Sequence, residues 1–152
     1  MANKVLWAPE SIATLLSTEL NNMANAALVV DGADYDNATN KFRFADFFLH
    51  LEDFDAAPTA GGYFELHIFY KFDGSLYADN EEGDAATPVR NANSLHGVFP
   101  VAATDGPQNI ELLGVPLSPI AFKCAVYNGC GQDLTAVDTH YLKMVAYNEE
   151  IQ

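Results

Sequence analysis

The sequence predicts an all-β chain that folds as an antiparallel β-sandwich or jelly roll, with an N-terminal arm or a short N-terminal helix. Three observations lead to this fold class. Residues 63–72 alternate strictly, so that one face of an extended segment is wholly apolar: Phe64, Leu66, Ile68, Tyr70 and Phe72. The same alternation recurs along the chain with turn-forming residues between the segments. No strand–helix–strand rhythm, the mark of a parallel sheet, is present.

The N-terminal quarter leaves two structures open. The 152 residues suit one domain, and we expect an N-terminal arm over residues 1–25 and a single β-sandwich domain over residues 26–152. Within the arm, residues 9–23 form a helical stripe after Pro9, which slightly favours a helix. The alternative is a strand near residues 11–17 followed by an Asn-rich turn.

The strands that follow are expected in this order. Residues 26–30 form a short apolar strand, and residues 31–40 form a loop dense in turn formers. Residues 41–52 form a long strand whose apolar phase slips near Ala45-Asp46, which predicts a β-bulge. In the strand over 63–72 the face opposite the apolar one is expected to be less buried: Tyr63, Glu65, His67, Phe69 and Lys71.

The second half continues the same pattern after a long acidic loop over residues 73–88. We expect seven or eight strands in all, and those of this half cover 89–101 (one or two strands), 108–113, 120–127 and 137–147. In the strand over 120–127, four residues alternate towards the core: Ile120, Phe122, Cys124 and Val126. We expect Phe64, Leu66, Ile68 and Phe122 to be core residues.

The charge balance excludes two classes of partner. The chain has 21 acidic and 7 basic residues and a net charge of −14. Such a surface repels nucleic acid, whose phosphates are bound by Lys and Arg, and it repels anionic lipid headgroups. The first residues contain no apolar stretch typical of a secretory signal, and no apolar run approaches the roughly 20 residues that cross a bilayer. We therefore expect synthesis in a cytoplasm and no direct binding to nucleic acid or membrane.

Catalytic and metal-binding signals are weak throughout. Cys124 and Cys130 lack metal or redox spacing, which favours two free thiols over a disulfide. His50 and His67 lie on consecutive predicted strands and could approach each other, but no further ligands cluster with them. The loop over 31–40 resembles a calcium loop in composition only, and the acidic loop over 73–88 could bind calcium weakly. We expect no enzyme activity, no catalytic residue and no cofactor.

Several short segments share their order and spacing with one known family. They are 35–40 (YDNATN), 58–61 (PTAG), 72–74 (FDG) with Tyr77, 115–119 (VPLSP), 122–123 (FK), 128–129 (NG) and 147–150 (YNEE). Together they resemble the jelly-roll capsid decoration, or cement, proteins of tailed bacteriophages. The similarity runs from about Leu16 to the end and lies in structural motifs. Where that family usually has Leu-Pro-Pro, this chain has Leu117-Ser118-Pro119.

The resemblance implies a structural protein of the virion. Its location would be the outer capsid surface, after synthesis in the cytoplasm of a bacterial host, and its partner would be the major capsid protein, with self-association as a dimer or trimer. We expect the N-terminal segment to supply the interface through Val5, Leu6, Trp7, Ile12, Leu15 and Leu16. The alternative is a carbohydrate- or receptor-binding module on the virion surface or tail, served by exposed aromatic residues: Trp7, Tyr35, Tyr63, Tyr77, Tyr127, Tyr141 and Tyr147.

Overall fold

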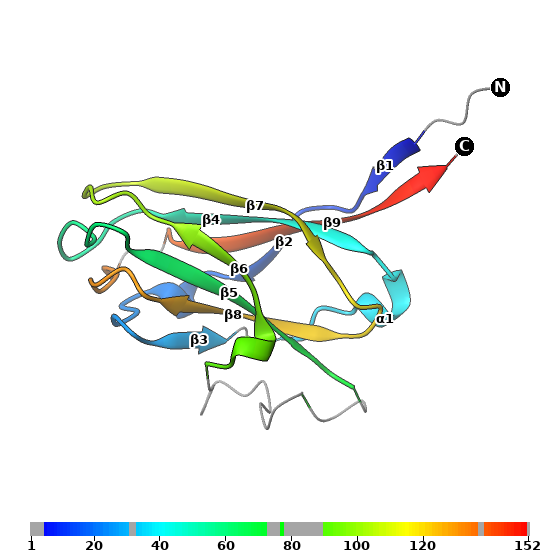
Figure 1. The fold of residues 1–152 in the computed structure, drawn as a ribbon, viewed down its shortest axis with the longest axis horizontal. Helices are drawn as coiled ribbons and strands as arrows, with labels where there is room; N and C mark the ends of the chain where they lie inside the picture. Colours follow the sequence, from blue (N-terminus) through cyan, green and yellow to red (C-terminus); the bar gives the residue numbers. More distant parts are fainter. Residues whose placement is uncertain (1–4, 31–32, 73–76, 78–89, 137–138, 152) are drawn as a thin grey trace.

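The fold is a sandwich of two antiparallel sheets. The structure, a computed structural model, describes residues 5–30, 33–72, 77, 90–136 and 139–151, and of residues 5–8 and 150–151 it describes the backbone. The two sheets lie one above the other in Figure 1, and strand β1 together with the end of strand β9 extends away from both of them. The all-β sandwich expected from the sequence is confirmed.

The five-stranded sheet, called sheet A here, has the strand order β1-β9-β4-β7, and β2 also pairs with β9. Strand β9 is the longest, so β2 pairs with its first half and β1 with its second half, where Pro9 lies opposite Tyr147 and Val5 opposite Ile151. All of these pairings are antiparallel. The strands are β1 (Val5–Pro9), β2 (Ala13–Leu16), β4 (Phe44–Leu51), β7 (Gln108–Pro116) and β9 (Tyr141–Ile151).

The four-stranded sheet, called sheet B here, has the order β3-β8-β5-β6. Its strands are β3 (Leu28–Val30), β5 (Tyr63–Tyr70), β6 (Leu95–Pro100) and β8 (Phe122–Asn128). Three short helical turns complete the described elements: η1 (Thr18–Leu20), α1 (Asn37–Asn40) and η3 (Ala92–Ser94). No helix in the described ranges is long and apolar enough to span a membrane.

One hydrophobic core fills the space between the sheets. The predicted core residues Phe64, Leu66, Ile68 and Phe122 are at most 1% exposed. From sheet A, strand β4 contributes Phe47, Leu49 and Leu51 and strand β9 contributes Leu142, Met144 and Ala146. Burying side chains of this size stabilises the fold by about 1.5–3 kcal/mol each before the conformational entropy is counted.

The N-terminal quarter belongs to the sandwich from Ala13 onward, which corrects two expectations. Residues 13–16 form strand β2 and residues 18–20 a 3₁₀ turn, so the helix favoured by the pattern is wrong and the strand alternative is confirmed. Leu15 and Leu16, expected in an interface, are 7% and 1% exposed and lie in the core. The arm assigned to residues 1–25 therefore ends before Ala13, because β2 pairs with β9 and carries core residues.

The bulge predicted near Ala45-Asp46 is present in the pairing at Asp46, but its extra residue lies on the neighbouring strand. Strand β4 alternates regularly between buried and half-buried residues, and its pairing with β9 has no shift. The shift occurs against β7, where Leu113 and Gly114 together lie opposite Asp46. Gly114 has a φ of +68°, the left-handed conformation that glycine adopts readily at such bulges. The apparent phase slip arises because Phe44 points outward, where it stacks on Tyr147.

Strand β5 is buried on both faces, contrary to the single buried face that alternation suggested. Its outward residues Glu65, His67 and Phe69 are 5%, 1% and 1% exposed. Phe69 packs with Val30 and Ala125 in a second apolar cluster outside the main core. The two polar residues are buried because distant side chains satisfy them, as described below.

Hydrogen bonds from a buried asparagine hold the loop over residues 33–43 in place. Asn37 is fully buried; its Nδ2 donates to the carbonyl oxygens of Phe42 (2.9 Å) and Ser118 (2.7 Å), and its Oδ1 accepts from the Phe42 amide. Asp36 caps the single turn of α1 by accepting from the Thr39 amide, and Asp34 pairs with Lys71 at 2.7 Å. These contacts are those of an Asx-rich turn. The acidic loop over 73–88 lies outside the described residues apart from Tyr77.

Candidate functional site on the outer face of sheet A

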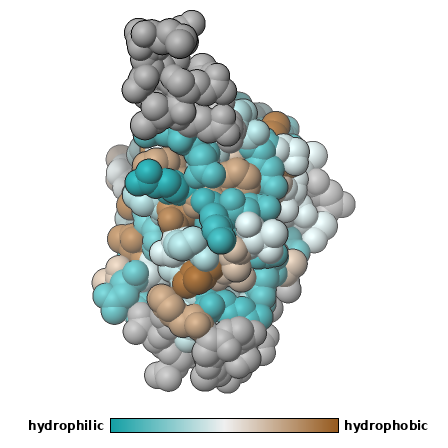
Figure 2. Space-filling model, turned by 90° about the vertical axis from the view of Figure 1, so that its right-hand side faces the viewer, coloured by the Kyte–Doolittle hydropathy of each residue, from teal (hydrophilic) through white to brown (hydrophobic). Residues whose placement is uncertain are grey.

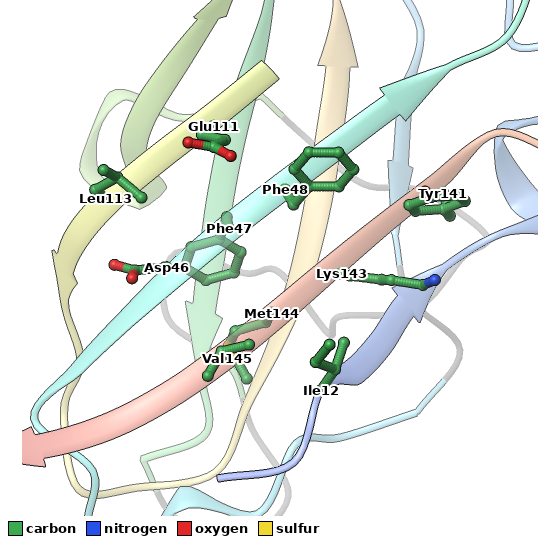
Figure 3. A pocket seen from close by; sticks show the side chains of 10 residues that line it. All are labelled: Ile12, Asp46, Phe47, Phe48, Glu111, Leu113, Tyr141, Lys143, Met144 and Val145. Atoms are coloured by element: carbon green, nitrogen blue, oxygen red, sulfur yellow. The ribbon is translucent and has the colours of Figure 1, made fainter. Parts of the chain in front are cut away.

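Outward side chains of sheet A gather into one shallow depression. It has a volume of about 390 Å³, and we call it the outer furrow. Glu111 and Leu113 stand on β7 at one side of β4, and Ile12 and Lys143 stand at the other side (Figure 3). The lining residues are Ile12, Asp46, Phe48, Glu111, Leu113, Tyr141, Lys143 and Val145, with Phe47 and Met144 beneath them.

The sheet register explains why these residues meet. Phe48 of β4 lies opposite Glu111 of β7 and also opposite Lys143 of β9, so the three side chains form a row across the sheet. Successive residues of a strand point to opposite faces. The core residues Phe47 and Leu49 therefore direct the intervening Phe48 outward. Leu113 reaches the same face because it lies two residues after Glu111 on β7.

Apolar exposure is high along the furrow. Ile12 and Leu113, which lie on opposite sides of β4, are 67% and 69% exposed. By contrast, the end of the molecule shown in Figure 2 is mostly hydrophilic, with small and separate hydrophobic areas. The furrow is therefore a candidate surface for a partner with apolar groups.

The aromatic side chains of the furrow are already engaged with their neighbours. The ring of Tyr141 lies 4.8 Å from that of His50 and 6.1 Å from that of Phe48, measured between ring centroids. The Lys143 Nζ lies 4.0 Å from the Tyr141 centroid, a cation–π distance. These contacts limit the area of the Tyr141 ring that a flat ligand could stack on.

The furrow continues to the place where β1 and β9 leave the body of the protein. A second depression shares Asp46, Leu113 and Val145 with it and adds Pro9, Gly114 and Tyr147. At this end the Asp46 carboxylate accepts hydrogen bonds from the Gly114 amide at 2.7 Å and from the Tyr147 hydroxyl at 3.1 Å. Burial and the bond to Asp46 raise the pKa of Tyr147. Through Asp46, the bulge on β7 is therefore connected to β9 at the point where β1 and β9 leave the sandwich.

A second cluster lies on the outer side of sheet B. Arg90 donates to both oxygens of Glu65, from Nε at 2.6 Å and from Nη2 at 2.5 Å, and its guanidinium lies 4.1 Å from the Tyr127 ring centroid. His67 contacts Glu65 through Nε2 at 3.1 Å and the Ser94 hydroxyl through Nδ1 at 2.9 Å. The hydrogen bonds from Arg90 lower the pKa of Glu65, and burial lowers the pKa of His67.

These residue types occur in hydrolases, but their arrangement here is structural. Ser94 is 6% exposed, and its hydroxyl also donates to the Asn91 carbonyl oxygen at 2.9 Å. The depression of about 260 Å³ beside the cluster is lined by Glu65, His67 and Arg90 but not by Ser94. The Glu65 carboxylate is neutralised by Arg90. Arg90 and Ser94 supply the hydrogen bonds that the buried Glu65 and His67 of β5 need.

The remaining predicted candidates do not come together. His50 lies on the outer face of sheet A and His67 on that of sheet B, so the two histidines do not approach each other, although their consecutive strands left this open. Cys124 and Cys130 are buried, and both are thiols and not a disulfide. No group of three possible metal ligands occurs among the described residues. Of the predicted interface residues, Ile12 lies in the outer furrow, and the side chains of Val5, Leu6 and Trp7 lie outside the description.

Sequence reasoning missed the outer furrow and the role of Arg90. The available signal for the furrow was Leu112-Leu113, two consecutive apolar residues in a strand, one of which must point away from the core.

Comparisons with known proteins find matches among solved structures. No family model matches the chain, and no curated protein matches it. Among solved structures, carbohydrate-binding module CBM36 in complex with calcium and xylotriose is 12% identical, with a TM-score of 0.40 over 100% of both chains. The CBM36-1 domain of a multidomain xylanase from the hindgut metagenome of Trinervitermes trinervoides is 12% identical, with a TM-score of 0.42 over 99% of this chain and 97% of that one. The Yersinia pseudotuberculosis-derived mitogen is 7% identical, with a TM-score of 0.25 over 97% and 85%.

Proposed function

We propose that this chain is a non-enzymatic structural protein of a tailed-phage virion, which decorates the outer capsid surface and binds the major capsid protein lattice. The observation that carries the proposal is the two-stranded ribbon formed by β1 and the second half of β9, called the ribbon here. Its backbone pairs from Pro9 with Tyr147 to Val5 with Ile151, and it extends beyond the sandwich (Figure 1).

A ribbon of this kind is suited to binding another chain. Two paired strands without a sheet or a core against them are marginally stable in water. The sequence of β1, VLWAP, is apolar throughout, which suits a segment that contacts another chain. Contact with a neighbouring chain would cover this segment. Aromatic anchors such as Trp7 often dominate the energy of such contacts.

Two further features support the capsid exterior. A net charge of −14 is unfavourable next to densely packed DNA and is compatible with the outside of the shell. Some of the segments that resemble decoration proteins contact each other in this fold. Asn37, in the segment over 35–40, donates a hydrogen bond to the carbonyl oxygen of Ser118, in the segment over 115–119. Tyr35 likewise pairs with Phe122.

A lattice engages many copies at once, so each copy needs only a modest interface.

The proposal is tested on particles that lack this protein. They should assemble but release DNA at a lower temperature than complete particles, and purified protein should restore their stability. In solution, protein lacking residues 1–8 should melt at nearly the same temperature as the full-length protein. Added to depleted particles, it should restore their stability poorly. A suitable control is Phe72→Ser, because Phe72 is 68% exposed and lies away from the ribbon. If depleted particles are equally stable and fail only to adsorb to cells, the decoration role is wrong.

A second candidate function, carbohydrate binding, is favoured by one observation. Phe48 and Tyr141 line an open furrow together with the carboxylates of Asp46 and Glu111, and aromatic rings beside a few polar groups are typical of small-molecule sites. Calorimetric titration with a panel of oligosaccharides tests this candidate. Binding that is lost in Phe48→Ala and kept in Tyr127→Ala, an aromatic substitution on sheet B, would favour it over lattice decoration.

A further inference from the structure

The last residues of strand β9 have an edge that no neighbouring strand covers. Strand β9 pairs with β4 as far as Tyr147, which lies opposite Phe44. Beyond Tyr147, residues 148–151 pair with β1 on one side, and on the other side no strand of the described ranges pairs with them. In Figure 1 the chain that precedes β4 runs towards α1, while β9 continues into the ribbon. We call this uncovered side of residues 148–151 the β9 edge.

A buried asparagine explains why β4 does not continue along the β9 edge. In the register of the two strands, the next residue opposite Glu149 would be Phe42. The Phe42 amide instead donates to Asn37 Oδ1 at 2.9 Å, and its carbonyl oxygen accepts from Asn37 Nδ2 at 2.9 Å. Lys41 has a φ of +55°, so the chain turns out of the strand direction at this point. The backbone groups of Phe42 are therefore committed to Asn37.

The hydrogen bonds of β9 show which of its backbone groups point to the β9 edge. The Glu10 amide donates to the Ala146 carbonyl oxygen at 2.8 Å, so the backbone groups of Ala146 face the β1 side. Successive residues of an antiparallel strand present their backbone groups to opposite sides. The odd-numbered residues of β9 therefore face the β4 side. Tyr147 is paired there with β4, whereas Glu149 and Ile151 have no backbone partner in the described part of the chain.

The charge beside the β9 edge favours one kind of partner. Glu149 is exposed and lies two residues after Tyr147, so it shares the outer face of sheet A with Asp46. Glu150 follows it in the sequence. Two copies of this chain that paired through the β9 edge would bring like charges together, which is unfavourable across a strand pair. A strand that carries Lys or Arg has the complementary charge.

We propose that the β9 edge binds an extended basic segment of another protein by strand addition, antiparallel to β9 and in line with β4. Unpaired backbone groups at the edge of a sheet are a template for an added strand, and main-chain hydrogen bonds supply the affinity in such complexes. The added strand makes the two-stranded ribbon three-stranded, which is the size at which a small sheet becomes stable in water. A basic side chain of the added strand lies beside Glu149.

This inference deepens the proposed decoration role and rests on it for the identity of the partner, which would be an extended basic segment of the capsid lattice. The two ideas fail separately. Strand addition is measured on purified protein with a synthetic peptide, whereas decoration is measured on particles.

The first experiment is amide hydrogen exchange, followed by NMR on purified full-length protein. The probe is a short peptide that alternates lysine with valine. The amides of Glu149 and Ile151 should exchange freely in the protein alone and at least about tenfold more slowly with the peptide bound. The control is the fully N-methylated peptide, which has the same sequence and charge but no amide donors, and it should bind about tenfold more weakly.

Three results of this experiment would overturn the proposal. A protected Glu149 amide in the protein alone would show that the β9 edge is already paired. Equal binding of the two peptides would show that charge alone attracts them. No binding of the lysine peptide up to a concentration of about a millimolar would exclude a useful site.

Proline substitutions on the two sides of the ribbon locate the added strand. Trp7 lies directly opposite Glu149, and by the same alternation its amide faces the other side of the ribbon. Glu149→Pro and Trp7→Pro therefore each remove one outward amide and leave the neighbouring bonds between β1 and β9 in place. Glu149→Pro should raise the dissociation constant of the lysine peptide about tenfold, and Trp7→Pro should raise it less than about threefold. Equal or reversed effects would refute the β9 edge as the binding site.

Glu149→Thr separates the charge from the backbone. This variant keeps the amide and a residue type that favours strands, so it tests the site even if proline distorts the ribbon. Losing one cross-strand charge pair should raise the dissociation constant by up to about fivefold. An unchanged dissociation constant would refute the basic character of the partner.

Discussion

Removing the guanidinium of Arg90 should destabilise the fold by about 2–3 kcal/mol. Arg90 donates two short hydrogen bonds to Glu65, whose side chain is 7% exposed. Breaking a buried ion pair by deleting one partner costs about 3–5 kcal/mol, and a hydrogen bond to a charged group contributes about 1.5–3 kcal/mol. The Arg90 side chain is 45% exposed, so water reaches it and the lower part of this range applies.

The assay is urea unfolding of Arg90→Ala at pH 7, with Arg90→Lys and Arg43→Ala as comparisons. Arg90→Lys keeps the charge but loses the two parallel bonds, so its cost should be intermediate. Arg43→Ala should cost about 0.5–1 kcal/mol, because Arg43 contacts a ring, that of Phe44 at 5.7 Å, and forms no ion pair among the described residues. A cost below 0.5 kcal/mol for Arg90→Ala would refute the argument that Glu65 depends on Arg90.

The effect should also depend on pH in one direction. Arg90 lowers the pKa of Glu65 in the folded state, so the unfolded chain binds the proton more readily. The stabilisation is therefore complete above the unfolded value of about 4.3 and is lost as the pH falls through the lower folded value. The difference between wild type and Arg90→Ala should shrink towards pH 3, and a difference that stays constant would contradict the charge-based explanation.

Three further predictions concern single side chains. The wild type should lose stability between pH 7 and pH 5, because burial lowers the pKa of His67 and only the unfolded chain takes up its proton below about 6.5. His67→Gln lacks this group, so urea unfolding should show a smaller loss for the variant over the same pH range. Asn37→Ala should cost about 2–3 kcal/mol in thermal unfolding, since three hydrogen bonds to the backbone are lost, whereas the exposed Asn40→Ala should cost less than about 1 kcal/mol. Gly114→Ala should cost about 1–2 kcal/mol from its φ of +68° alone, because no clash awaits a Cβ there, and Gly114→Asn should cost less; equal losses would exclude the conformational cause.

Several strands could be predicted from the sequence because they bury alternate residues in the core. In the segment over 120–127, Phe122, Cys124 and Val126 are buried as expected, whereas Ile120 lies before the strand and is half-buried. The N-terminal quarter was ambiguous because the residues of its helical stripe are buried in either structure. Leu16 lies on β2 and Leu20 in a 3₁₀ turn, and both are in the core. A list of buried positions therefore does not separate the two backbone conformations.

The outward face of β5 could not be predicted from β5 alone. Glu65 and His67 have the polarity of solvent-facing residues, and they are buried because Arg90 and Ser94, about 25 residues further along the chain, supply their partners. A charged residue is buried only when such a partner exists. The alternation of a strand contains no information about partners from elsewhere in the sequence, so the polar face appears exposed until the fold brings the partners together.

The furrow also could not be predicted from the sequence, because its residues come from four strands or their ends and meet only through the sheet register. Strand β9 joins the furrow and the ribbon, since its first half borders the furrow and its second half forms the ribbon with β1. Asp46 ties the two regions together by accepting from both Gly114 and Tyr147. A partner that fixes the ribbon therefore also fixes the end of the furrow. Under the proposed decoration role, the two features would therefore form one interaction surface.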